Sequence, residues 1–84
     1  SEDASNVLAK TLTALDSNSK MQTDVVNKML DGMVESYDEA YAKIRDIIAS
    51  SGTSVDTFTK DITNKTQTEL SNTELLLLLL MILM

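Results

Sequence analysis

The chain has 84 residues, of which 43% are hydrophobic, and its 13 acidic and 7 basic residues give a net charge of −6. Because Cys and His are absent, disulfides, thiolate metal sites and the commonest general base and thiol nucleophile are excluded. The acidic balance also argues against nucleic acid as a partner. We expect a single small domain over residues 1–84 that is not an enzyme and takes no cofactor or metal.

The apolar spacing predicts an all-α fold. The chain has no Pro and only two Gly, so few positions force a turn and periodic apolar residues indicate helix. The first predicted helix covers residues 4–15, with Val7, Leu8, Leu12 and Leu15 on one side. Residues 16–19 have polar side chains that favour hydrogen bonds with the nearby backbone, and they interrupt the helical apolar spacing.

The longest predicted helix covers residues 20–50. Its apolar residues repeat every three or four positions, which is typical of a helix with one buried stripe. Gly32 is the one interruption and indicates a bend or a close contact. The stripe forms a predicted helix seam of Val26, Leu30, Met33, Tyr37, Ala40, Ile44 and Ile47.

A turn is predicted around Gly52, within the Ser-Ser-Gly-Thr-Ser segment at residues 50–54. Glycine ends helices readily because it adopts the left-handed conformation, and the following hydroxyls can cap a new helix. We therefore expect a helical hairpin of two to three helices, with a further helix over residues 55–70. That helix is rich in Thr, an indifferent helix former that needs packing to stay helical.

Residues 75–84 read LLLLLLMILM and follow a capping-box pattern at Ser71 and Glu74. The predicted helix over residues 72–84 is apolar on all sides, but ten residues span only about 15 Å against a bilayer core of about 30 Å. An ordinary core helix is one interpretation. The favoured interpretation is self-association, because a hairpin has too little apolar surface left over to cover this helix. The residues that would associate are Leu75, Leu76, Leu77, Leu78, Leu79, Leu80, Met81, Ile82, Leu83 and Met84.

Asp31, Glu35, Asp38 and Glu39 form the densest acidic cluster, whose carboxylates could hold a hard cation such as calcium. Its spacing does not match an EF-hand loop. A solvated helix face is the favoured interpretation.

The chain is small and acidic, has helix-turn-helix character around residues 50–54, lacks Cys and Trp, and is rich in Ser, Thr and Asn. In these general features it resembles the exported filament subunits of type III secretion systems, the needle and inner-rod class. The resemblance implies a secreted helical hairpin that polymerises around a channel. The chain departs from this class in lacking a Pro-containing turn and in ending with a Leu run.

These observations predict a structural self-assembling subunit of a helical homo-oligomer, an exported filament or tube of a secretion apparatus. Its partners would be copies of itself and a chaperone before assembly, and its location secreted or at the cell surface. One alternative is a small membrane-active or tail-anchored protein. The other is a helical interaction module whose tail binds a chaperone or partner groove. On the leading hypothesis, deleting residues 75–84 should leave a soluble monomer or small oligomer.

Overall fold

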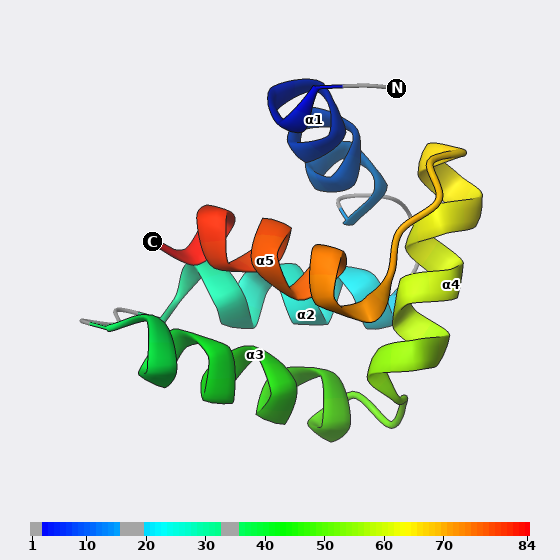
Figure 1. Cartoon of the computed structure of the whole chain (residues 1–84). Helices are drawn as coiled ribbons and strands as arrows, with labels where there is room; N and C mark the ends of the chain where they lie inside the picture. Colours follow the sequence, from blue (N-terminus) through cyan, green and yellow to red (C-terminus); the bar gives the residue numbers. More distant parts are fainter. Residues whose placement is uncertain (1–2, 16–19, 33–35) are drawn as a thin grey trace.

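The computed structural model describes residues 3–15, 20–32 and 36–84, and these residues form helices and connecting turns without a strand. The prediction of an all-α fold is confirmed, but the expected two to three helices are too few. The described residues form five helices, shown in Figure 1: α1 (Ala4–Leu15), α2 (Lys20–Leu30), α3 (Tyr37–Ser50), α4 (Val55–Thr66) and α5 (Asn72–Leu83).

The predicted continuous helix over residues 20–50 is wrong, because two helices, α2 and α3, occupy that range. At the end of α2, the Gly32 N–H donates to the carbonyl of Met29 at 3.2 Å. Ser36 caps the start of α3, where its Oγ accepts from the backbone N–H of Glu39 at 3.2 Å. A helix of 31 residues would be about 46 Å long, whereas the longest dimension of the protein is 31 Å.

Gly52 forms the turn between α3 and α4. Its φ of +80° lies in the left-handed region that favours glycine. Its N–H donates to the carbonyl of Ala49 at 3.1 Å, which gives a hydrogen-bond partner to one of the carbonyl groups in the last turn of α3. The Oγ of Ser54 then accepts from the N–H of Thr57 at 3.1 Å and caps the start of α4.

Replacing Gly52 with Ala should lower the free energy of unfolding by about 1 kcal/mol, the cost of a Cβ in the left-handed conformation. Apart from Gly52 and its two chain neighbours, no heavy atom lies within 4 Å of the position that the new Cβ would take, so backbone strain is the whole expected effect. Urea unfolding would show a lower midpoint with an unchanged slope. Ser50→Ala, at the exposed end of α3, is the control, and equal midpoints for both variants would contradict the prediction.

The helix predicted over residues 55–70 ends early, at Thr66, and α5 is a separate helix. Gln67 takes a left-handed φ of 56° and stops α4. The capping box predicted from the sequence starts α5: the Ser71 Oγ accepts from the Glu74 N–H, and the Glu74 carboxylate accepts from the Ser71 N–H, both at 3.1 Å.

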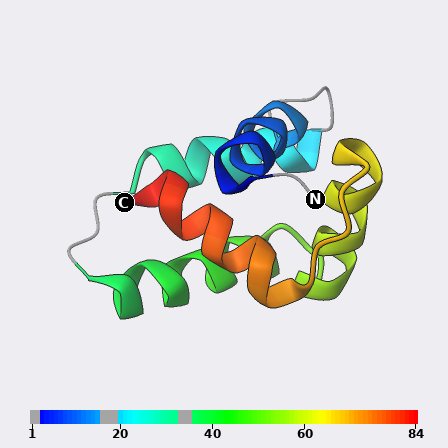
Figure 2. The same cartoon turned by 45° about the horizontal axis from the view of Figure 1, so that its top comes forward.

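The five helices enclose one hydrophobic core (Figures 1 and 2). Helix α5 packs against α3 and α4, while α1 packs against α4 and α2, and α2 packs against α3. The radius of gyration is 11.7 Å, close to the value of about 12 Å expected for a compact chain of this length. All five helices contribute to the core cluster, which consists of Ala14, Leu15, Val25, Met29, Ala40, Ile44, Ile47, Ile48, Phe58, Ile62, Leu75, Leu76, Leu79 and Leu80.

A buried polar contact joins α2 to α4. The Gln22 side chain is fully buried; its amide donates to Asp61, and its carbonyl oxygen accepts from the Lys65 ammonium. Asp61 and Lys65 also pair with each other at 3.4 Å along α4. Because a buried amide is costly without partners, this contact fixes the position of α2 against α4.

Candidate interaction surface

The structure divides the predicted self-association residues between the core and the surface. Five of the ten are buried within the chain itself, two are partly buried, and three are more than half exposed. The buried residues are Leu75, Leu76, Leu78, Leu79 and Leu80; the partly buried residues are Ile82 and Leu83; and the exposed residues are Leu77, Met81 and Met84.

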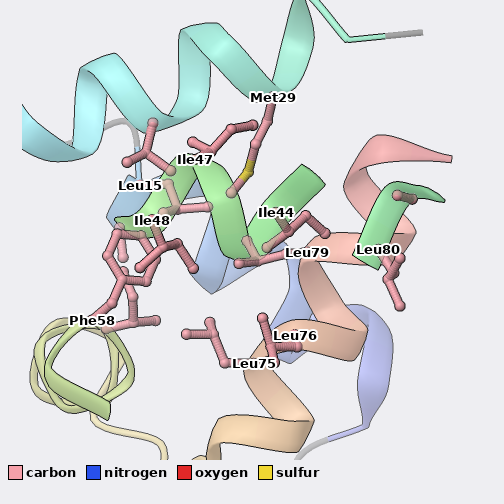
Figure 3. Close-up of a cluster of buried hydrophobic side chains, with 14 residues drawn as sticks. Leu15, Met29, Ile44, Ile47, Ile48, Phe58, Leu75, Leu76, Leu79 and Leu80 are labelled. Atoms are coloured by element: carbon pink, nitrogen blue, oxygen red, sulfur yellow. The ribbon is translucent and has the colours of Figure 1, made fainter. Parts of the chain in front are cut away.

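The expectation that the rest of the chain cannot cover residues 75–84 is therefore wrong. That expectation depends on a hairpin, in which one long helix offers a single apolar stripe to cover the tail. Because α2 and α3 are separate helices and the chain turns again at Gly52, the core receives apolar side chains from all five helices. Figure 3 shows Leu75, Leu76 and Leu79 among the core side chains, with Ile44 and Ile48 of α3 close to Leu79.

The exposed apolar residues of α5 and of its C-cap, Met84, form a stripe along one side of the helix. Leu77, Met81 and Met84 are 53%, 54% and 53% exposed. Their spacing of four and then three residues places them on one helix face. Half of α5 therefore holds the fold together, while this stripe remains available for contacts.

The predicted helix seam is also divided. Ala40, Ile44 and Ile47 are buried on α3, and Val26 is partly buried on α2. Leu30 and Tyr37, on either side of the break, are each 67% exposed, so they belong to no continuous buried stripe. The remaining seam residue, Met33, lies outside the described residues.

An apolar groove of about 490 Å³ runs between α1 and α5, which we call the α1–α5 groove. Val7 and Leu78 are buried, while Leu77 and Met81 stand half exposed. Two carboxylates, Glu69 and Glu74, belong to the lining, which contains no basic residue among those described. The full lining is Ala4, Val7, Thr68, Glu69, Leu70, Glu74, Leu77, Leu78 and Met81.

A smaller pocket of about 280 Å³ is lined by residues of α1, α2 and α5, and we call it the α2 pocket. All its lining residues are apolar: Leu12, Leu15, Val26, Met29, Leu30 and Ile82. Leu12 and Leu30 are 42% and 67% exposed. The groove and the pocket thus contain four of the six large hydrophobic residues found exposed in the described part of the chain.

Two wider hollows, of about 620 and 580 Å³, border α4. Their linings are mainly polar or small side chains, and neither contains a large apolar residue from the exposed set. The large exposed apolar side chains that line a hollow therefore belong to α1, α2 and α5 and not to α4.

The described residues contain no group of three or more acidic, His or Cys side chains placed to hold a metal ion. Within the same residues, no helix combines the length and apolar character needed to cross a bilayer. No protein-family model, curated protein or solved structure matches the chain.

Neither the α1–α5 groove nor the α2 pocket was predicted from the sequence. The apolar run at residues 75–84 signalled an unusual surface, but Ala4, Val7, Leu12 and Leu30 lie on helices far away in sequence. The only local signal is that residues 75–84 are apolar on every side, so a helix packed on one side must expose apolar residues on the other.

Proposed function

We propose that the protein is a non-enzymatic helical interaction module that binds a helix of another protein along the α1–α5 groove. The observation that carries this proposal is that exposed Leu and Met side chains line the groove and exposed Leu side chains line the α2 pocket, both of which involve α1 and α5. The absence of His and Cys from the sequence supports a role in binding rather than catalysis.

The physical basis is the burial of apolar surface. An exposed, contiguous apolar patch favours association because covering a Leu or Met side chain fully is worth about 1.5–3 kcal/mol. A partner helix presents apolar residues every three or four positions, which suits a groove lined by apolar residues of two helices. Met81 and Met84 are unbranched and flexible, so they can adapt to different partner side chains.

A display library of helical peptides provides a direct test. Peptides selected on the intact protein should lose about tenfold to a hundredfold in affinity when Leu77 or Met81 becomes Lys, as expected for residues at the centre of an interface. Tyr37→Lys is the matched control, because Tyr37 is also exposed and apolar but lines neither the groove nor the pocket. Equal losses for Tyr37→Lys, or unchanged binding to Leu77→Lys, would refute the proposal.

Self-association is a second candidate function, favoured by the exposed stripe of Leu77 and Met81 on α5 and Met84 at its C-cap. A second copy covering this stripe would form the homo-oligomer that the sequence suggested, including a filament of the exported class. Sedimentation velocity over a hundredfold range of concentration distinguishes the candidates. Self-association predicts larger species at high concentration that disappear in Leu77→Lys and persist in Tyr37→Lys; a monomer throughout rejects it.

A further inference from the structure

We propose that the occupant of the α1–α5 groove is an amphipathic helix whose apolar stripe is flanked by Lys or Arg side chains. This inference rests on the proposed function and specifies the chemistry of the partner. It follows from two features of the groove, its apolar floor and its acidic border.

The floor is apolar. Val7 and Leu78, which are 9% and 7% exposed, are its buried lining residues, and Leu77 and Met81 are its half-exposed ones. The small side chain of Ala4 on α1 also lines the groove and leaves room for a large partner side chain. Since Leu77 and Met81 lie one helical turn apart, a partner helix can match them with apolar residues at a spacing of three or four.

The border carries negative charge from two elements. Glu69 lies in the segment between α4 and α5, and Glu74 lies in the first turn of α5, where the capping box orients its carboxylate. Asp3 directly precedes Ala4 and accepts from the Asn6 N–H at 2.8 Å. Lys60 lines the neighbouring hollow, together with both glutamates, but it pairs with Asp56 at 3.0 Å.

Charge complementarity therefore favours a basic partner over a second copy of this chain. A copy would bring its own net charge of −6 towards an acidic border, and juxtaposed like charges oppose association. Lys or Arg beside the apolar stripe of a partner would instead meet Glu69 and Glu74, which would steer the partner and fix its direction in the groove.

The test uses three fluorescein-labelled peptides of 18 residues that share one helical stripe of Leu and Ala. The positions flanking the stripe are all Lys, all Gln or all Glu. Fluorescence anisotropy with the full chain should show the Lys peptide binding about tenfold more tightly than the Gln peptide, with the Glu peptide weakest, which corresponds to about two exposed ion pairs. The preference should shrink in high salt, because exposed charges are screened.

Charge variants locate the effect in the groove. Glu69→Lys should weaken binding of the Lys peptide about fivefold and leave the Gln peptide nearly unchanged. Glu74→Gln should act in the same direction, about twofold, and Gln retains an acceptor for the capping box. Asp46→Lys is the control: it changes the net charge as Glu69→Lys does, but Asp46 is exposed on α3 and does not line the groove.

The outcomes separate this inference from the proposed function. Equal affinities for the Lys and Gln peptides, both lost in Leu77→Lys, would overturn the basic partner while supporting a helix-binding groove. Equal weakening by Glu69→Lys and Asp46→Lys would also overturn it, since only overall charge would then matter. If none of the three peptides binds and the display library yields no groove-dependent binder, both proposals fail.

Discussion

Deleting residues 75–84 should unfold the remaining chain. The deletion removes Leu75, Leu76, Leu79 and Leu80 from the core, where each is no more than 4% exposed. Burial of four Leu side chains contributes about 6–12 kcal/mol, which is comparable to the whole stability of about 5–15 kcal/mol typical of a small protein. The faces of α3 and α4 that pack on α5 would at the same time be exposed to water.

Far-UV circular dichroism and thermal melting of the truncated chain measure this effect. We expect low helicity and no cooperative transition. Removal of Met84 alone is the control, because that residue is 53% exposed and lies outside the core cluster; its loss should change little. A truncated chain that remains helical and melts cooperatively would contradict the structure and agree with the assembly tail predicted from the sequence.

The sequence predicts helices well where local signals are strong. The pattern over residues 4–15 coincides with the bounds of α1, and the capping box at Ser71 and Glu74 marks the start of α5. The turn at Gly52 is predictable because glycine readily takes the left-handed conformation that ends a helix, and its φ of +80° lies in that region. These features depend on a few neighbouring residues, so the sequence alone contains them.

The long helix over residues 20–50 failed because two local signals opposed the heptad pattern. Gly32 and the Ser36 cap both favour ending one helix and starting another, and neither is visible in a pattern of apolar positions. Once the chain breaks there, Leu30 lies at the end of α2 and no longer shares a helix face with Ile44, and Tyr37 is the first residue of α3. Tertiary packing then leaves both Leu30 and Tyr37 exposed.

Within residues 75–84, the division into buried and exposed side chains could not be predicted. A uniform run of Leu is apolar on every side, so it gives no indication of which face will pack inward. The positions of α3 and α4 decide this, by covering Leu75 and Leu79 and leaving Leu77 outside. The groove was missed for the same reason, because it exists only where α1 comes near the outer side of α5.

The central claim is that α5 is a core helix of this chain with one exposed stripe, and a matched pair of substitutions tests it. Leu79 is fully buried and Leu77 is 53% exposed, two residues apart on the same helix. Lys has nearly the helix propensity of Leu. The two Leu→Lys variants therefore differ mainly in whether the new charge lies in the core or at the surface. A Lys at position 79 would place a charge in the core without a partner, at a cost of several kcal/mol.

Thermal unfolding of Leu79→Lys and Leu77→Lys, followed by circular dichroism, is the most direct measurement. The structure predicts that Leu79→Lys shows no cooperative transition. For Leu77→Lys it predicts a Tm within about 4 °C of the parent protein, because exposed substitutions usually change stability by less than about 0.5 kcal/mol. If both variants melt alike, whether both fold or both unfold, α5 has no buried and exposed sides and the account is wrong.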